Sequence, residues 1–276
     1  MSEETEKDIF IVSPSSLDTL EACMRRYFYT KVAHLAPKEK NEALIRGDFT
    51  HEILENYYNG KKDLRPDNLH ETLEYASKRA SERIDLESSL AEVCIDVFRE
   101  YALHYVNQDW EILGVEAKFS RVLYENEVVK ILFEGKMDLV VNINGKVIPI
   151  DHKTRARKED PNKLANQYIG YAWAVDTNMV IENEIGFQTS KKAAEKFRQS
   201  VMSYTAANIN EWHENAVYHS LRAYELTKEN FFPMSPAACK FCNYYEICET
   251  TPESRPFKIG RDYTENEAYD LFAQRR

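Results

Sequence analysis

Apolar residues follow two different periods along this chain. In six stretches they recur every three or four positions, as in a helix with one buried face, and elsewhere they alternate with polar residues or form short runs, as in strands. The pattern predicts helices from position 14 and over 43–58, 68–84, 87–106, 162–176 and 206–227, with strands over 110–123, 128–150, 184–189 and 197–203. This order predicts an α/β fold with a mixed sheet flanked by helices.

The chain length of 276 residues allows one sizeable core. We predict a single domain over 1–254 with a helical insertion at about 60–108, followed by a weakly patterned tail over 255–276. A short helix is expected near 265–272. The insertion either covers a site on the sheet or simply packs against the sheet.

A two-residue turn, Asn144–Gly145, divides the long strand stretch into a hairpin. If these two residues form the centre of the turn, stepping outward along both strands places Asp138 opposite Asp151. Because side chains alternate between faces, Lys136 and Lys153 should share the face of the two aspartates. Leu139 and Ile150 should then point to the opposite, apolar face.

Directly opposed carboxylates repel each other unless a cation lies between them. A divalent metal would remove this repulsion, and an Asp-x-Lys sequence at a strand end places a charged amine beside the metal. Such a pairing suits phosphodiester hydrolysis. The alternative is an ordinary exposed hairpin face, because short motifs often mislead.

The run from Gly135 to Asp138, followed by Asp151-His152-Lys153-Thr154, resembles the PD-(D/E)XK nucleases. It is most similar to their RecB-like branch, which includes the nuclease of AddAB helicase-nucleases and CRISPR-associated RecB-like exonucleases. The resemblance implies a restriction-endonuclease-like fold, with Asp138, Asp151 and Lys153 as catalytic residues. It also implies a Mg²⁺ or Mn²⁺ ion held by the two aspartates, with the backbone carbonyl of His152 as a further ligand.

Two more segments follow the pattern of this branch. His51, in Arg46-Gly47-Asp48-Phe49-Thr50-His51-Glu52, corresponds to a helix-borne metal ligand of catalytic importance, although a histidine on an amphipathic helix is often structural. Gln167 and Tyr171 match a Gln-x-x-x-Tyr motif, and their spacing places them on one helix face. The implied role is to position DNA or the active-site groups; simple helix packing is the alternative. Glu116 lies where related proteins often carry a glutamate, to orient the metal site or to pair with a basic neighbour.

The resemblance extends to the cysteines. A lone Cys23 near one end and Cys239, Cys242 and Cys248 near the other have the spacing that holds a 4Fe-4S cluster in the resembling nucleases. Structural zinc is the alternative, because four thiolates also suit tetrahedral Zn²⁺. Cys94 lies in an apolar helical pattern and is predicted to be a small buried residue.

The net charge of −10 argues against indiscriminate coating of nucleic acid, but basic residues form two local groups that would suit a narrow path for DNA. The first group comprises Lys153, Arg155, Arg157, Lys158 and Lys163, and the second comprises Lys191, Lys192, Lys196 and Arg198. A solvated surface is the usual alternative. Few cysteines and no membrane-spanning or secretory pattern favour an intracellular, cytoplasmic protein, in a host cytoplasm if it is phage-encoded.

Together these features predict a metal-dependent DNA exonuclease acting on single-stranded or frayed ends in recombination, repair, phage DNA processing or CRISPR adaptation. A structure-specific or flap endonuclease and a noncatalytic DNA-binding scaffold subunit are the alternatives. The sequence has no Gly-x-x-x-x-Gly-Lys phosphate-binding loop, so a helicase or recombination partner would have to supply any unwinding.

Overall fold

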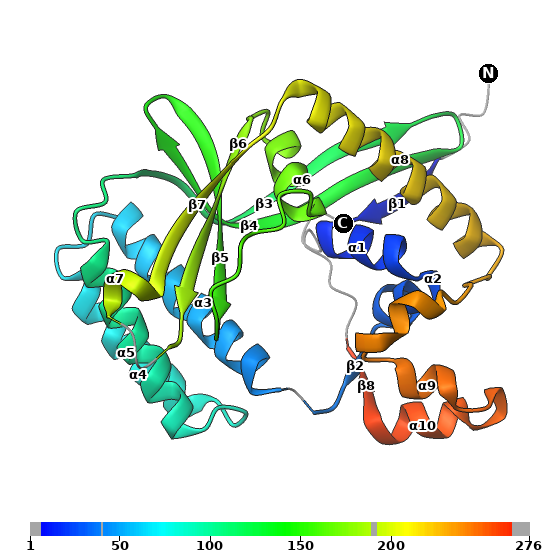
Figure 1. Cartoon of the computed structure of the whole chain (residues 1–276), viewed down its shortest axis with the longest axis horizontal. Coiled ribbons are helices and arrows are strands. Elements are labelled where there is room, and N and C mark those ends of the chain that lie inside the picture. Colours follow the sequence, from blue (N-terminus) through cyan, green and yellow to red (C-terminus); the bar gives the residue numbers. More distant parts are fainter. Residues whose placement is uncertain (1–6, 40, 189–191, 267–276) are drawn as a thin grey trace.

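A six-stranded sheet forms the centre of the computed structural model, which describes residues 7–39, 41–188 and 192–266 (Figure 1). The strands of this sheet are β1 (Asp8–Val12), β3 (Glu111–Glu125), β4 (Val129–Ile143), β5 (Lys146–Arg155), β6 (Met179–Gly186) and β7 (Phe197–Ser203). Helices lie on both faces of the sheet, so the predicted α/β architecture is confirmed.

The long strand β4 organises the sheet. β3 pairs with it in antiparallel fashion along one edge. Its other edge is shared, because β1 runs parallel to its first half and β5 runs antiparallel to its second half. Beyond this hairpin β5 pairs with β6 in parallel, and β6 pairs with β7 in antiparallel fashion. The sheet is therefore mixed, and β5 leaves β4 to join β6 at its carboxyl end.

One face of the sheet is covered by helices from separate parts of the chain. They are α1 (Pro14–Ala22), α2 (Met24–Tyr27), α6 (Asn166–Ala174) and α8 (Ala206–Lys228). Their core includes Leu17 of α1 and Trp212 of α8, packed with Phe133 of β4. The start of α1 is well capped, because Ser13 and Ser16 exchange hydrogen bonds and Pro14 occupies the first turn.

Three consecutive helices cover the other face: α3 (Glu42–Lys62), α4 (Asn68–Glu82) and α5 (Ser88–His104). Phe49 of α3 and Phe98 of α5 pack there with Leu139 and Ile150. The segment predicted as an insertion therefore packs against α3 and the sheet, and it supplies a large share of this core. The short α7 (Ala193–Lys196) precedes β7.

A smaller third unit joins the two ends of the chain (Figure 1). It contains a π-helical turn, Phe28–Val32, together with β2 (Leu35–Pro37), α9 (Tyr245–Glu249), α10 (Arg255–Asp262) and β8 (Tyr263–Glu265). β2 pairs with β8, and Tyr29, Tyr244 and Ile247 form its core. Residues 255–265 thus pack as part of the fold. The remainder of the helix expected near 265–272 lies outside the described residues from position 267 onward.

The predicted elements agree best where one face is buried. The strand over 197–203 has the predicted bounds, and the helix over 206–227 extends by one residue. The strand predicted over 184–189 begins earlier in the structure, because β6 spans Met179–Gly186. Glu182 and Glu184 are buried within this strand. Position 189 lies outside the described residues. Because these glutamates interrupt the apolar run, the sequence pattern does not identify the start of this strand.

No helix in the described part of the chain has the length and apolar character needed to cross a membrane.

Gly170 tests the packing between α6 and the sheet. A Cβ atom there would lie 2.6 Å from Cζ of the buried Phe133 and 3.0 Å from Trp212. Because both rings are buried in the core, we expect Gly170→Ala to lower the free energy of unfolding by about 1–3 kcal/mol in urea denaturation. Gly260→Ala in α10 is the matched control, since its Cβ would meet nothing within 4 Å. That variant should be neutral or slightly stabilising; equal effects at both positions would contradict the packing account.

Candidate metal and catalytic site

The hairpin between β4 and β5 has the predicted register. Asn144 and Gly145 have φ values of 53° and 80°, as a two-residue turn with both central residues left-handed requires. Ile143 pairs with Lys146, and the ladder continues to the pair Leu139 and Ile150. The prediction is confirmed over this whole ladder, which delivers Asp138 and Asp151 to its open end.

Asp138 is the centre of the site. Its carboxylate accepts a 2.7 Å hydrogen bond from the backbone N–H of His152, which bridges β4 and β5 just beyond their ladder. On the other edge of β4, Val115 pairs with Leu139 and Ala117 with Met137, so Glu116 lies opposite Asp138. Asp138 therefore lies between two strands that each carry acidic residues.

His51 reaches Asp138 from α3. Its Nδ1 atom lies 3.6 Å from Oδ2 of Asp138. One helical turn earlier, Gly47 lets α3 approach β5 closely, because a Cβ atom at that position would lie 3.3 Å from the hydroxyl oxygen of Thr154. The absence of a side chain at position 47 therefore helps to bring His51 to the sheet.

His51, Glu116 and Asp138 form a group of potential metal ligands. One ligand atom from each residue lies within 4.8 Å of the other two, and all three residues are partly buried. Imidazole nitrogen and carboxylate oxygen suit a divalent cation. Glu116 has φ of 49°, a left-handed conformation that is unfavourable for a residue with a side chain. Such outliers occur at functional sites when the surrounding structure enforces them.

Glu116 also makes an ion pair with Lys136. Two roles were considered for Glu116, orienting the metal site or pairing with a basic neighbour. The structure is compatible with both, because Glu116 belongs to the candidate metal group and also pairs with Lys136. Glu55, four residues after His51 on α3, lies near the Glu116 carboxylate. Burial raises the pKa of Glu55, and the charge of Glu116 raises it further. Glu55 is not among the site residues predicted from the sequence, although its spacing of four residues from His51 on the helix is a signal that could have identified it.

Asp151 lies next to the His51–Glu116–Asp138 group, but its side chain contacts Lys153 and Gln167. Its side chain is 1% exposed and forms a 2.8 Å ion pair with Lys153. Its other oxygen accepts a 2.6 Å hydrogen bond from the amide of Gln167. Asp151 and Asp138 are close enough that the charge of Asp138 raises the pKa of Asp151. The predicted clustering of the two aspartates and Lys153 is therefore present, whereas the group within 4.8 Å contains Glu116 instead of Asp151.

Gln167 and Tyr171 support this pair from α6. Gln167 accepts a 2.9 Å hydrogen bond from Lys153, and its amide also donates to the Tyr171 hydroxyl at 3.1 Å. Tyr171 in turn donates to the backbone carbonyl of Lys136 at 2.8 Å. Because Tyr171 is only 4% exposed, its contacts are with the protein. Of the roles considered for these two residues, the geometry favours positioning of the active-site groups.

The side chain of His152 points into the core on the α3 side of the sheet. It is 2% exposed and stacks on Tyr58, with ring centroids 5.4 Å apart. Burial lowers its pKa to about 3, so the imidazole stays neutral. Its Nδ1 atom contacts the amide of Asn183 at 3.0 Å. The role predicted for its backbone carbonyl as a metal ligand stays a prediction.

Burial controls the charges at the site. It raises the pKa of Asp138 and that of Asp151 to about 6 each, and it lowers the pKa of His51. Without a cation, all three groups therefore tend towards their neutral forms near pH 6. A bound divalent ion would favour the two carboxylates and the neutral imidazole together.

Several of the basic residues predicted to form a path for DNA are used inside the protein. Arg155 binds the fully buried Glu182 with two hydrogen bonds, at 2.5 and 3.0 Å. Arg198 binds Glu184 at 2.6 Å, and Lys196 binds Glu100 at 2.7 Å. These contacts correct the expectation of a continuous basic path, because carboxylates from neighbouring elements neutralise these cations. The exposed members of the first group are Arg157, Lys158 and Lys163, and Lys191 lies outside the described residues.

Contacts and electrostatic effects connect the four predicted cluster cysteines, of which Cys23 lies between α1 and α2 and Cys248 lies on α9. Ser235 contacts both Cys23, through its N–H at 3.4 Å, and Cys239, through its carbonyl at 3.8 Å. Cys248 lies close enough to Cys242 and Cys23 that both influence its pKa. Cys94 is 0% exposed in α5, as predicted for a buried residue.

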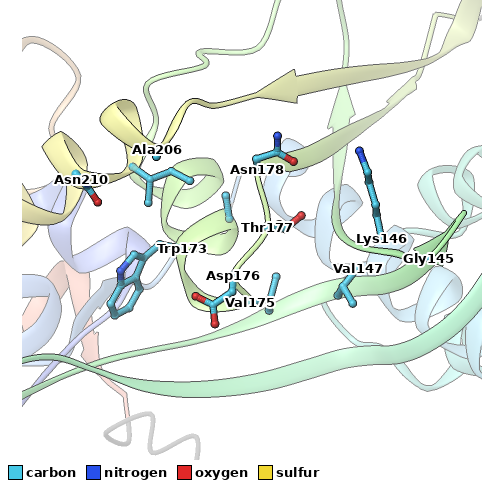
Figure 2. Close-up of a pocket in the computed structure, with 12 residues that line it drawn as sticks. Gly145, Lys146, Val147, Trp173, Val175, Asp176, Thr177, Asn178, Ala206 and Asn210 are labelled. Carbon is cyan, nitrogen blue, oxygen red and sulfur yellow. The ribbon is translucent and has the colours of Figure 1, made fainter.

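The cysteine group borders a cavity of about 870 Å³, whose lining includes Cys239, Cys242 and Tyr245. A separate hollow of about 620 Å³ lies at the turn of the hairpin, lined by Lys146, Trp173 and Asp176 among others (Figure 2). Lys146 stands five residues before Asp151, so this hollow is on the order of 16 Å from the carboxylates along β5. Neither hollow is lined by the His51–Glu116–Asp138 group.

Comparison with known proteins identifies relatives of this chain. The family model of the PD-(D/E)XK nuclease superfamily matches residues 11–249. None of the curated proteins matches in sequence. Among solved structures, the chain is similar to a protein from Eubacterium rectale described as a putative exonuclease, with a TM-score of 0.50 and 15% identity over 85% of this chain and 86% of that chain. The protein SSO0001 has a TM-score of 0.42 and 15% identity, over 88% and 87% of the two chains.

The raised pKa of Asp138 predicts a pH-dependent effect of Asp138→Asn. A carboxyl whose folded pKa of about 6 exceeds its unfolded value of 3.8 stabilises the fold below pH 4, and this contribution is lost as the pH rises through 6. The metal-free variant should therefore be more stable than wild type at pH 8, by on the order of 1–3 kcal/mol, and not at pH 4. Thermal unfolding at both pH values measures this. Added Mn²⁺ should stabilise only the wild type at pH 8; a pH-independent difference would contradict the account.

Proposed function

The chain belongs to the PD-(D/E)XK nuclease superfamily, and we propose that it is a metal-dependent DNA exonuclease of the RecB-like branch, acting on single-stranded or frayed ends. One observation carries the proposal: the candidate ligands His51, Glu116 and Asp138 lie beside the Asp151–Lys153 ion pair. The fold shared with a structure described as a putative exonuclease supports the end-directed activity.

The donor set fits Mg²⁺ or Mn²⁺. Two carboxylates and one imidazole offer mainly hard oxygen ligands, and Asp151 lies near enough for the charge of Asp138 to raise its pKa. When bound, the ion supplies Lewis acidity towards a phosphoryl oxygen and a lowered pKa for water. The buried position of the ligands strengthens these electrostatic effects because little bulk water screens them.

Lys153 supplies a positively charged side chain at the proposed active site. The ammonium is anchored by Asp151 and by Gln167, at 2.8 and 2.9 Å, and its side chain remains 33% exposed. This leaves part of the group available to the substrate. Lys153 would orient or help to deprotonate the attacking water and would stabilise the negative charge that develops on the phosphate.

Gln167 and Tyr171 hold this pair in place. Gln167 contacts both members of the pair, and Tyr171 connects Gln167 to the backbone of β4. A single chain of hydrogen bonds therefore links the Lys153 ammonium to the strand that carries Asp138. This arrangement fixes the distance between the amine and the candidate metal group before substrate arrives.

DNA would reach the site from the exposed loop after β5. Arg157 and Lys158 follow directly after this strand, and Lys163 precedes α6. All three side chains are exposed, so they would contact phosphates near Lys153. With a net charge of −10 over the chain, such contacts would be confined to this edge of the site.

We further propose that Cys23, Cys239, Cys242 and Cys248 hold a 4Fe-4S cluster. Their approach from both ends of the chain fits a metal centre. The spacing of these cysteines matches that of the cluster-holding nucleases, and structural zinc is the alternative because four thiolates also suit tetrahedral Zn²⁺. These cysteines are not paired in disulfides, and cysteines that ligate such a cluster suit a reducing, cytoplasmic compartment.

Cleavage of end-labelled DNA tests the nuclease proposal. With Mg²⁺ or Mn²⁺, the anaerobically purified protein should degrade linear single-stranded DNA and leave closed circles intact. Lys153→Ala should lower the rate by at least about 100-fold, because it removes the charge that stabilises the transition state. Lys146→Ala, an exposed lysine at the other end of the same strand, is the matched control and should retain activity.

The outcomes of this assay separate the alternatives. Cutting of closed circles would identify an endonuclease and overturn the exonuclease assignment. DNA binding without cleavage by cluster-loaded protein would identify a scaffold subunit. Equal activity of Lys153→Ala and Lys146→Ala would remove Lys153 from the proposed mechanism.

Metal analysis tests the cluster proposal. The protein purified without oxygen should contain iron and acid-labile sulfide in equal amounts, with visible absorption that bleaches in air. Cys248→Ser should lose iron and unfold at a lower temperature, because the link between the two ends of the chain is removed. Cys94→Ala, at a buried cysteine outside the group, should keep its iron. Stoichiometric zinc without sulfide would overturn the proposal in favour of a zinc site.

A further inference from the structure

Four buried polar side chains form a closed network behind the candidate metal group. The hydroxyls of Tyr58 and Tyr101 are 2.5 Å apart. The amide of Asn183 donates to Tyr101 at 2.6 Å and contacts Nδ1 of His152 at 3.0 Å. His152 closes the ring by stacking on Tyr58, with an interplanar angle of 14°. None of the four residues is more than 3% exposed.

Each member of this network comes from a different element. Tyr58 lies on α3, Tyr101 on α5, His152 on β5 and Asn183 on β6. β5 and β6 are already paired at this level, because His152 is in register with Asn183. The network therefore adds what the ladder lacks, a set of directional contacts between the sheet and the helices above it.

The helix held by this network is the one that carries His51. His51 precedes Tyr58 by seven residues, about two turns on the same face of α3. The His51 ring also meets the ring of His152 edge-on, with centroids 6.3 Å apart. His152 thus touches α3 at two points, while its own backbone N–H binds Asp138.

The polar character of the network is more than stability requires. An apolar cluster of the same shape would be about as stable, because polar groups lose their bonds to water on burial. Hydrogen bonds differ from apolar contacts in being directional, so the bonds from Tyr58 through Tyr101 and Asn183 to His152 fix the rotation and height of α3 on the sheet. Nε2 of His152 and Oδ1 of Asn183 have no hydrogen-bond partner among the described residues. A helix free to shift would move His51 relative to Asp138, which lies 3.6 Å away.

We propose that Tyr58, Tyr101, His152 and Asn183 are positioning residues, whose network holds α3 on β5 so that His51 is aligned with Asp138 for metal binding. The inference rests on the proposed function in one respect, the role of His51 as a metal ligand. It assigns the His152 side chain a task of its own, separate from the backbone of the same residue.

The decisive variant is Tyr101→Phe, which removes the hydroxyl shared by Tyr58 and Asn183 and keeps the ring. Mn²⁺ affinity of the full chain, followed by electron paramagnetic resonance, should fall about tenfold, as expected when the support of a metal ligand is lost. Tyr57→Phe is the matched control, since Tyr57 lies in the same core and its hydroxyl takes no part in the network. It should bind Mn²⁺ as the wild type does. Thermal unfolding of each metal-free variant establishes that it is folded.

Two further variants keep the inference separable from the proposed function. Tyr58→Phe preserves the stacking on His152 and loses only the hydroxyl bond, so it should also weaken Mn²⁺ binding. His51→Ala provides the reference for complete loss of the ligand. A lower unfolding temperature with unchanged Mn²⁺ affinity in both Tyr101→Phe and Tyr58→Phe would show a purely structural role and overturn the inference. Unchanged affinity in His51→Ala would overturn the metal role of His51 and the inference with it.

Discussion

The repulsion among acidic side chains gathered at the open end of the hairpin is the constraint on which this site depends. Asp138 lies between Glu116 and Asp151, and all three carboxylates are shielded from solvent. The protein compensates only in part. Lys136 pairs with Glu116 and Lys153 with Asp151, which leaves Asp138 with a backbone N–H as its hydrogen-bond donor. The divalent cation proposed for this site would supply the counter-charge for the remaining carboxylate, and burial raises the pKa of both Asp138 and Asp151.

Buried carboxylates also occur on the neighbouring strand β6, where arginines neutralise them. Glu182 and Glu184 are fully buried on β6, in register with Asp151 and Lys153. There the counter-charges are Arg155 and Arg198, so the glutamates carry internal ion pairs in place of a metal group. Removing one partner of such a pair would leave an uncompensated buried charge. Neighbouring strands of the sheet thus carry two adjacent acidic regions, one neutralised by arginines and one suited to a metal ion.

Both faces of the sheet contribute to holding the site. On the α6 side, Gln167 fixes the Asp151–Lys153 pair through direct hydrogen bonds. On the α3 side, the ring that includes Tyr101 and His152 connects the helix of His51 to β5. The cysteine group connects Cys23, between α1 and α2, to Cys248 in the third unit of the fold. A cluster there would act on the site through the fold, by holding α1 and α2 against the C-terminal segment.

Sequence alone determined what depends on local rules. The Asn144–Gly145 turn fixes the register that brings Asp138 and Asp151 to one end of the hairpin, because two-residue turns leave no freedom in pairing. The periodic helices and the spacing of Gln167 and Tyr171 were likewise readable from positions along the chain. Only the tertiary structure decided which distant groups meet. It brought Glu116 and His51 to Asp138, neutralised Arg155 with a buried glutamate, and turned the His152 side chain towards Asn183. These contacts join residues from separate elements, and the packing that creates them leaves no periodic signal in the sequence.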